Sequence, residues 1–315
     1  MALLEVLVAD ATEQGAGNRA LRLEPLTGTL PPFQAGAHVD VHLPGGLVRQ
    51  YSIASAPAAR DHYLLCVKRE ADSRGGSRHI HEQLGPGHRL WISTPRNLFE
   101  LQAEGPHLLL AAGIGITPLL SMARALDAQG QPFVLHYYVH DRARAAFAGE
   151  LQAGFAHGRV ELHASTEGTS ARRHVPAELD TPRGHLYLCG PAAFMDRFAT
   201  LAAAHGWDSG QMHREHFAGV AATLADDEAF EVELASTGLV VEVAADTTIA
   251  QALEAAGFPL PVSCEQGICG ACVTGVRAGI PAHRDCVLSE QEHAANTCIT
   301  PCCSRSRSPR LVLEL

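Results

Sequence analysis

The stretch Cys264-Glu-Gln-Gly-Ile-Cys269-Gly-Ala-Cys272 decides how the C-terminal third of the chain is interpreted. Four residues separate its first two cysteines and two separate the next pair, and Cys302 follows after 29 more. This is the ligand spacing of a plant-type [2Fe–2S] cluster, a one-electron carrier. The residues between the cysteines are mostly small or polar, and glycines let backbone N–H groups approach the sulfur atoms. The spacing therefore predicts an iron–sulfur module.

Two alternatives apply to this loop. A zinc site usually pairs two Cys-x-x-Cys segments, whereas this chain has one. Cys303 competes with Cys302 as the fourth ligand, and the spacing alone leaves both open.

The chain has nine cysteines, an odd number that argues against a disulfide framework. We expect most of the remaining cysteines to be buried thiols: Cys66, Cys189, Cys286, Cys298 and, if Cys302 is the ligand, Cys303.

The composition is that of a globular chain without a nucleic-acid partner. Of its 315 residues, 46% are hydrophobic and 18% charged, which allows two or three cores of ordinary size. The formal net charge of −10 offers no basic patch. The N-terminus lacks the pattern of a signal peptide, and no apolar run approaches the ~18 residues of a membrane span. We therefore expect a cytoplasmic protein that does not enter a membrane.

The first two thirds of the chain contain two segments whose patterns of apolar residues differ. Up to about Leu101, short alternating runs separated by Pro and Gly predict strands at 37–43, 47–54, 63–68 and 88–93, and hence an antiparallel β-barrel. From His107, apolar strands alternate with helical stretches, which predicts a doubly wound parallel α/β sheet. The expected strands are 108–112, 133–139, 160–164 and 185–189, and the expected helices 118–128, 143–152 and 192–205.

A small, acidic stretch, Gly219–Glu228, precedes the cysteine segment, and we interpret it as a linker. We therefore expect three domains, at 1–101, 102–224 and 229–315. The last is expected to be a β-grasp ferredoxin domain. Its predicted elements are a hairpin from 230–234 and 239–243, a helix ending at Gly257, a short helix with a Ser289/Glu292 capping box, and a strand at 310–315.

Two stretches in the first segment suit a ligand with a phosphate group. In Arg49-Gln50-Tyr51-Ser52, an Arg can neutralise phosphate, a Tyr can lie against a flat ring, and a Ser hydroxyl can bond a ring nitrogen. After Val67-Lys68, the run Arg74-Gly75-Gly76-Ser77 opens a helical stretch whose N-terminus suits a terminal phosphate. A surface turn with charged neighbours is the alternative for this second stretch.

The middle segment carries dinucleotide signals. Gly113-Ile-Gly115-Ile-Thr117-Pro118 follows a buried strand and opens a helix, so its glycines allow the backbone to approach a pyrophosphate. The third glycine of the Rossmann fingerprint is absent. Cys189-Gly190-Pro191 places a thiol at the carboxyl edge of the sheet, where ligands bind. Asp141, after the strand 133–139, is suited to accept a ribose 2′-OH and repel a 2′-phosphate, although Arg142 and Arg144 are nearby.

These motifs, in this order, resemble one family. Arg-x-Tyr-Ser, Gly-Ile-Gly-Ile-Thr-Pro and Cys-Gly-Pro are similar to motifs of the ferredoxin–NADP reductase superfamily. With a C-terminal plant-type ferredoxin they resemble the phthalate dioxygenase reductase family. The run from Cys264 to Leu315, which includes His283-Arg284-Asp285 and Pro301-Cys302-Cys303-Ser304-Arg305-Ser306, is particularly similar to vanillate O-demethylase reductases. The resemblance covers essentially the whole chain.

The resemblance implies FMN, NADH and a [2Fe–2S] cluster, each with its own residues. FMN would be held by Arg49, Gln50, Tyr51 and Ser52, with Val67, Lys68, Gly75, Gly76 and Ser77 on the ribityl-phosphate side. NADH would be held by Gly113, Gly115 and Thr117, with Cys189 and Gly190 near the nicotinamide and Phe217 beside the flavin. The cluster ligands would be Cys264, Cys269, Cys272 and Cys302. Ser52, Cys189 and Phe217 would be the catalytic residues.

These expectations describe an enzyme that takes electrons from NADH in pairs and delivers them singly, with a flavin between. The resemblance implies a monomeric, NADH-dependent reductase component of a two-component Rieske non-haem iron oxygenase acting in aromatic O-demethylation or dihydroxylation. One alternative keeps this chemistry but has a cytochrome P450 or a diiron oxygenase as acceptor. A redox sensor is a second alternative, although no DNA-binding or signalling segment is present. A zinc-stabilised binding module, without iron, is a third.

Overall fold

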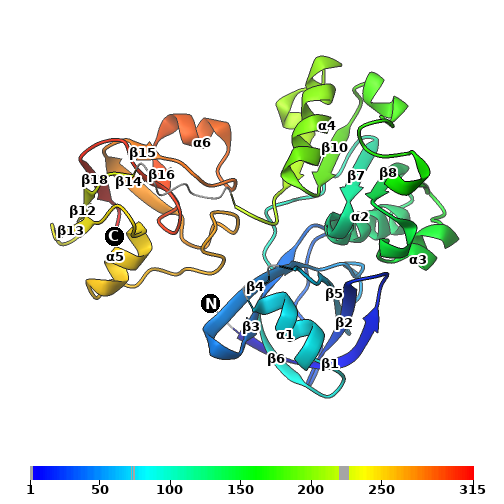
Figure 1. The fold of residues 1–315 in the computed structure, drawn as a ribbon, viewed down its shortest axis with the longest axis horizontal. Helices are drawn as coiled ribbons and strands as arrows, with labels where there is room; N and C mark the ends of the chain where they lie inside the picture. Colours follow the sequence, from blue (N-terminus) through cyan, green and yellow to red (C-terminus); the bar gives the residue numbers. More distant parts are fainter. Residues whose placement is uncertain (1–2, 72, 74, 220–226) are drawn as a thin grey trace. The chain divides into compact units, whose positions relative to one another are not determined.

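The structure is a computed structural model of the 315-residue chain, and it describes residues 3–71, 73, 75–219 and 227–315. The chain forms two compact units, Met1–Glu215 and His216–Leu315, and each has its own sheets and core (Figure 1). None of the described helices is both long enough and apolar enough to cross a bilayer.

An antiparallel sheet of six strands forms the N-terminal half of the first unit. Its order is β4-β3-β6-β1-β2-β5, and a bridge between Ile53 and Leu65 joins the two ends. The strands are β1 (Leu3–Glu13), β2 (Asn18–Pro25), β3 (His38–Leu43), β4 (Leu47–Ser52), β5 (Tyr63–Lys68) and β6 (Arg89–Ser93). Inward residues such as Val6 and Leu21 are completely buried, and helix α1 (Gly76–Gln83) adds Ile80 to this core. The predicted barrel is thus present.

Strands β1 and β2 were not predicted from the sequence. Their inward-facing Val and Leu residues alternate with polar and charged ones, among them Glu5 and Asp10, and the turn residues Gly15, Gly17 and Gly28 mark their ends, so the signal was present in the sequence. The strands are stable because each pairs along most of its length with its neighbours in the sheet.

A parallel sheet of five strands forms the other half of the first unit, in the order β11-β10-β7-β8-β9. The strands are β7 (His107–Ala112), β8 (Phe133–Val139), β9 (Gly158–Ala164), β10 (His185–Cys189) and β11 (Met212–Glu215). Helices α2 (Ile116–Ala128) and α3 (Ala148–Ala153) pack on one face, and α4 (Ala192–Ala204) packs on the other. The doubly wound arrangement is therefore as predicted.

The helix predicted at 143–152 is wrong in its first half. Residues Arg142–Arg144 form a 3₁₀ turn, and Phe147 then adopts a left-handed backbone with φ of 58°. A regular α-helix cannot continue through that conformation, so α3 begins only at Ala148.

The barrel and the parallel sheet share one buried core. Ala54 and Phe99 of the barrel side pack in the same cluster as Leu119 of α2. Arg124 of α2 donates to the Ala54 carbonyl at 2.6 Å, and Ser121 Oγ donates to the Ser55 carbonyl at 2.9 Å. These contacts hold the two halves of the first unit in one arrangement. The domain limits 1–101, 102–224 and 229–315 stay predictions.

The second unit has a mixed sheet in the order β13-β12-β18-β14-β16, with β12 and β18 parallel at its centre. Its elements are β12 (Phe230–Leu234), β13 (Val240–Val243), α5 (Ile249–Ala255), β14 (Thr274–Ala278), β15 (Pro281–Ala282), α6 (Glu290–Ala295), β16 (Cys298–Ile299), β17 (Arg305–Ser306) and β18 (Arg310–Leu313). Val232, Leu253 and Leu311 fill the core between α5 and the sheet. The predicted capping box of α6 is present, with Ser289 N donating to Glu292 Oε2 at 2.8 Å.

The predicted linker lies largely outside the described residues, which omit 220–226. Its ends are held by the second unit. Arg284 Nη1 donates to Asp227 Oδ2 at 2.8 Å, and Arg305 Nη2 donates to the Glu228 carbonyl at 3.0 Å. At the other end, a Cβ on Gly219 would overlap the Gln266 carbonyl oxygen in the cysteine loop.

Candidate functional site

Arg49 lies against the first turn of α1. A Cβ on Gly76, the first residue of this helix, would come within 2.6 Å of Arg49 Cγ, so only glycine leaves room for the guanidinium stem. Gly75 precedes it with φ of +97°, and the Ser77 hydroxyl donates to Ser73 Oγ at 3.0 Å. First-turn N–H groups beside a guanidinium are the donor set that a phosphate requires. The structure thus brings Arg49 and the glycine pair together.

Gln50 and Tyr51 have different surroundings. Tyr51 is partly buried against the barrel core, and this burial raises the pKa of its hydroxyl. Gln50 Nε2 donates at 2.9 Å to Oδ1 of the buried Asp40, which Arg96 also contacts at 2.6 Å. Gln50 therefore supports a buried ion pair beneath the motif. The sequence analysis did not identify Asp40 and Arg96.

The side chains of Val67 and Lys68 do not point to a direct role in the predicted FMN site. The Val67 side chain lies in the barrel core, and its carbonyl accepts from His81 Nε2 at 2.8 Å. Lys68 is exposed and pairs with Glu70 at 2.9 Å. Of these two side chains, that of Lys68 can reach a ligand, but its ammonium group must first break the ion pair with Glu70.

The glycine loop after β7 has one open position. Gly113 has φ of +55° and nothing within 4 Å of the place where a Cβ would be. A Cβ on Gly115 would overlap the Cys189 carbonyl, so this glycine lets the loop pack on the end of β10. Thr117 Oγ1 donates to the Ile114 carbonyl at 3.0 Å and is buried. Of the three predicted residues, Gly113 therefore leaves the most room for a ligand.

The ends of β4 and β10 meet at one carboxyl group, that of Glu215 at the end of β11. Ser52 Oγ donates to Glu215 Oε2 at 3.4 Å, and Cys189 Sγ lies 4.0 Å from the same oxygen. Desolvation raises the pKa of Glu215 to about 8, against a smaller lowering by the Ser52 hydrogen bond. Burial also raises the pKa of the Cys189 thiol. At neutral pH this meeting point is therefore largely uncharged.

Glu215 is a site residue that the sequence analysis missed. The available signal was an acidic residue two positions before Phe217, at the end of a short strand that pairs in register with β10. Phe217 itself falls in the second unit, and its side chain is 39% exposed.

Four cysteine sulfurs converge in the second unit, those of Cys264, Cys269, Cys272 and Cys302. Hydrogen bonds from Cys269 and Cys302 lower the pKa of the Cys264 thiol, and Cys302 lowers the pKa of Cys272. Cys264 therefore interacts with Cys269 and Cys302, and Cys302 also interacts with Cys272. The last three of the four side chains are at most 5% exposed. A set of four neighbouring thiols is the donor set of a [2Fe–2S] cluster.

The backbone of the cysteine loop bends around these sulfurs. Glu265 and Gly267 have φ of 54° and 71°. The N–H groups of Gln266 and Ala271 each lie 3.4 Å from a cysteine Sγ, as donors that stabilise thiolate.

Cys303 points to different partners. Its sulfur lies 3.3 Å from Thr300 Oγ1 and 3.9 Å from Ser304 Oγ, and it also contacts the sulfur of Cys302. Cys302 contacts both Cys264 and Cys272. This arrangement favours Cys302 as the fourth ligand.

A family model for the 2Fe-2S iron-sulfur cluster binding domain matches residues 232–307. Fold and site therefore define an iron–sulfur oxidoreductase, with a barrel and a parallel sheet in one unit and a ferredoxin in the other.

Similar proteins narrow this class. The chain is 49% identical to a vanillate O-demethylase oxidoreductase of Pseudomonas sp. (strain HR199 / DSM 7063) over 292 residues, 91% of this chain and 92% of that protein. It is 33% identical to a solved phthalate dioxygenase reductase, described as a modular structure for electron transfer from pyridine nucleotides to [2Fe–2S], with a TM-score of 0.71 over 100% of this chain and 98% of that one. A solved type IV self-sufficient cytochrome P450 monooxygenase is also similar, at 33% identity and a TM-score of 0.86, over 99% of this chain and 41% of that one.

The chain belongs to the family of oxygenase reductases that contains phthalate dioxygenase reductase and the vanillate O-demethylase oxidoreductases. It is an electron-transferring oxidoreductase with a [2Fe–2S] domain. The predicted fold class is confirmed, and so is the predicted set of FMN, NADH and a [2Fe–2S] cluster at the level of the family. The roles of single residues stay predictions.

Proposed function

We propose that the chain is the NADH-dependent reductase component of a two-component Rieske non-haem iron oxygenase. Electrons would enter at an FMN site in the first unit and leave through the [2Fe–2S] cluster of the second. The observation that carries the proposal is the meeting of Ser52 and Cys189 at Glu215. It supports direct transfer between two cofactors, because the end of the predicted flavin motif lies beside the end of the strand predicted to bind the nucleotide.

The residues of the first unit would divide the binding between them. Arg49 and the first turn of α1 would hold the FMN phosphate, and Tyr51 would support the flat ring. Gly113 would leave space for the pyrophosphate of NADH, with Cys189 and Gly190 near its nicotinamide. A bound flavin supplies the exchange of electrons either in pairs or singly.

Glu215 would keep the meeting point neutral. Its raised pKa means that the carboxyl group is protonated at pH 7 and can donate a hydrogen bond. A neutral carboxyl beside Ser52 adds no negative charge next to the electron-rich reduced cofactors. The buried Cys189 thiol is neutral for the same reason.

In the second unit, Cys264, Cys269, Cys272 and Cys302 would hold the cluster. The low exposure of Cys269, Cys272 and Cys302 limits the access of water to their sulfurs, and the N–H groups of Gln266 and Ala271 would stabilise the negative charge of the thiolates.

The partner would be a Rieske-type oxygenase, with this reductase acting as a cytoplasmic monomer. The identity of 49% over nearly the full length of a vanillate O-demethylase oxidoreductase supports an oxygenase that demethylates an aromatic ether. A cytochrome P450 is the second candidate acceptor, because a P450 monooxygenase contains a region with a TM-score of 0.86 to this chain.

The proposal is tested by removing the second unit. A chain that ends at residue 225 retains the first unit, whose core is its own. It should bind FMN and reduce ferricyanide with NADH as fast as the full chain, because ferricyanide accepts electrons from flavin directly. It should fail to reduce cytochrome c efficiently or to support an oxygenase. Oxygenase turnover by the truncated chain would show that the cluster is not the exit.

The acceptor is tested with the full chain and NADH. A purified vanillate O-demethylase oxygenase, which carries a Rieske centre, should turn over, and a P450 without its own reductase should remain oxidised. Reduction of the P450 alone would favour the second candidate.

A further inference from the structure

Three histidines and two glutamates gather on the α4 face of the parallel sheet, and none of them belongs to the sites described above. His136 comes from β8, and Glu161 and His163 come from β9. The register pairs His136 with Glu161 and Tyr138 with His163, so all four side chains lie on one face. His174, in the connection to β10, and Glu178, in the 3₁₀ turn Ala177–Asp180, complete the group.

The donor atoms of this group already have the spacing of metal ligands. His136 Nδ1 lies 2.9 Å from His163 Nε2 and 3.6 Å from Glu161 Oε2, and the last two atoms are 3.8 Å apart. Ligands of a tetrahedral Zn²⁺ with bonds of 2.0–2.1 Å are separated by about 3.3 Å. A nitrogen of His174 lies within 4.8 Å of the other three atoms. The four donors thus lie close enough together for one ion to bind all of them after small side-chain adjustments.

The second nitrogen of His136 is placed as a metal-bound histidine requires. The side chain is 1% exposed, and its Nε2 makes no hydrogen bond within the described part of the chain, although Glu178 Oε2 lies 3.3 Å away. A histidine that binds metal through one nitrogen usually donates the other N–H to a carboxylate. Binding through Nδ1 would put the proton on Nε2, facing Glu178.

The charges around the group are compatible with a cation. Arg159 pairs with Glu161 through Oε1 and also with Glu178, which leaves Glu161 Oε2 facing the histidines.

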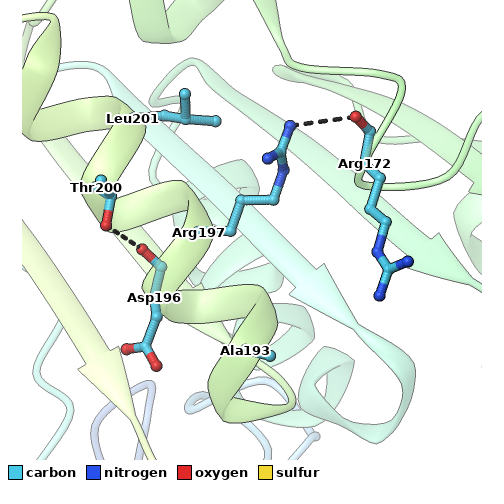
Figure 2. A pocket seen from close by; sticks show the side chains of 6 residues that line it. All are labelled: Arg172, Ala193, Asp196, Arg197, Thr200 and Leu201. Carbon is cyan, nitrogen blue, oxygen red and sulfur yellow. Dashed lines mark hydrogen bonds between the residues drawn. The ribbon is translucent and has the colours of Figure 1, made fainter.

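The segment that carries His174 is fastened to the rest of the domain. Tyr138 Oη donates to the His174 carbonyl at 3.3 Å, and the Tyr138 ring stacks on His163 with centroids 4.5 Å apart. Figure 2 shows Arg197 of α4 donating to the Arg172 carbonyl, at 3.1 Å, and Arg197 also donates to the Ala171 carbonyl at 3.0 Å. These bonds hold the fourth donor beside the sheet.

We propose that His136, Glu161, His163 and His174 bind one Zn²⁺, with Glu178 as the carboxylate that orients His136. Three imidazole nitrogens and one carboxylate oxygen suit zinc in a four-coordinate site. Because all four positions come from the protein, the site is structural: the ion fastens the edge strand β9 and the 165–180 connection to β8.

The test uses the full chain with flavin and cluster in place. After dialysis against a chelator that leaves the iron and sulfide content unchanged, the protein is equilibrated with ZnCl₂, and bound zinc is measured by mass spectrometry. The wild type should bind one zinc per chain. His174→Gln, a change in a surface segment, should lose that zinc, and Glu178→Gln should weaken binding by about 10- to 100-fold.

His213→Gln is the matched control, because His213 and His185 form another close histidine pair on the same sheet, at 3.0 Å. It should bind zinc like the wild type. X-ray absorption at the zinc edge should show only nitrogen and oxygen neighbours. Zinc bound to sulfur, zinc retained in full by His174→Gln, or no zinc in the wild type would each overturn the proposal.

Discussion

The two proposed cofactor regions hold their groups in different ways. In the second unit, three of the four converging cysteines come from the nine residues Cys264–Cys272, on a loop that bends through left-handed conformations at Glu265 and Gly267. In the first unit, Ser52, Cys189 and Glu215 come from the ends of three strands, far apart in the sequence. The loop lies between α5 and β14 and belongs to no helix or strand, whereas the strand ends are positioned by sheets and a shared core.

This difference sets how each region should respond to mutation. A cluster needs all four ligands at once, so the loss of one cysteine should remove it entirely. In the first unit each residue supplies one part of the binding free energy, so single substitutions should give graded losses. The predictions below test that contrast, from the largest expected effect to the smallest.

Cys302→Ser should abolish the cluster, while Cys303→Ser should leave it largely intact. Serine oxygen is a poor ligand for iron, and only the Cys302 sulfur contacts both Cys264 and Cys272. Iron and acid-labile sulfide counts on both purified variants check this. NADH–ferricyanide activity should survive in both, which shows that the first unit is folded. A full iron content in Cys302→Ser would reverse the choice of ligand.

Arg49→Ala should weaken FMN binding without abolishing it. The guanidinium lies against the first turn of α1, and a charged hydrogen bond to phosphate contributes roughly 1.5–3 kcal/mol, or about 10- to 100-fold in Kd. Fluorescence quenching of FMN by the flavin-free protein measures the change. Arg78→Ala, which removes an exposed arginine of the same helix, is the matched control and should bind FMN normally. Equal losses in both variants would refute a specific role for Arg49.

Glu215→Gln should change how the stability of the first unit depends on pH. Because desolvation raises the folded pKa to about 8 from 4.5, the folded state binds more protons than the unfolded state between these values. The free energy of unfolding should therefore fall as the pH rises from about 4.5 to 8, by an amount on the order of a few kcal/mol. The glutamine variant should lose this slope.

Urea unfolding between pH 5 and pH 9 measures this effect through tryptophan fluorescence, since both tryptophans, Trp91 and Trp207, belong to the first unit. Glu104→Gln, a change at an exposed acid in the same unit, should keep the wild-type slope. If Glu215→Gln keeps the wild-type dependence of unfolding free energy on pH, Glu215 is not the group that causes it.

The two regions also differed in how far the sequence could predict them. Three of the four predicted cysteine ligands follow from one local spacing that does not depend on tertiary structure, whereas Cys302 was chosen over Cys303 through the family resemblance. The glycines before α1 and after β7 were found for the same reason, since each turn is continuous in sequence. The barrel, the parallel sheet and the ferredoxin unit followed from the change in periodicity along the chain.

Features that depend on contacts between distant strands were missed. Glu215 becomes part of the candidate site only because β11 pairs with β10. Asp40, within β3, pairs with Arg96, which follows β6 and is 56 residues further along the chain. The histidine group requires the register of β8 with β9, in which His136 faces Glu161. In the sequence these residues look like isolated polar positions. The helix predicted from 143 failed because one residue, Phe147, adopts a conformation that propensity does not indicate.

The smallest expected effect concerns the choice between NADH and NADPH. Asp141 caps the 3₁₀ turn after β8, where one carboxylate oxygen accepts from Ala143 N at 2.8 Å. The other oxygen is suited to accept a ribose 2′-OH and to repel a 2′-phosphate. Arg142, which would otherwise attract that phosphate, pairs with Glu167 at 2.7 Å. The wild type should therefore prefer NADH.

Asp141→Asn keeps an oxygen for the cap but removes the charge. The ratio of kcat/KM for NADPH to that for NADH should rise roughly fivefold, because one exposed charge interaction contributes about 1 kcal/mol. Ferricyanide reduction with each nucleotide gives the ratio. Asp208→Asn, at another aspartate that precedes a 3₁₀ turn of the same sheet domain, should leave the ratio unchanged. Equal kcat/KM values for the two nucleotides in the wild type would show that Asp141 does not select between them. Asp141 would then not be one of the first-unit residues that each supply part of the binding free energy.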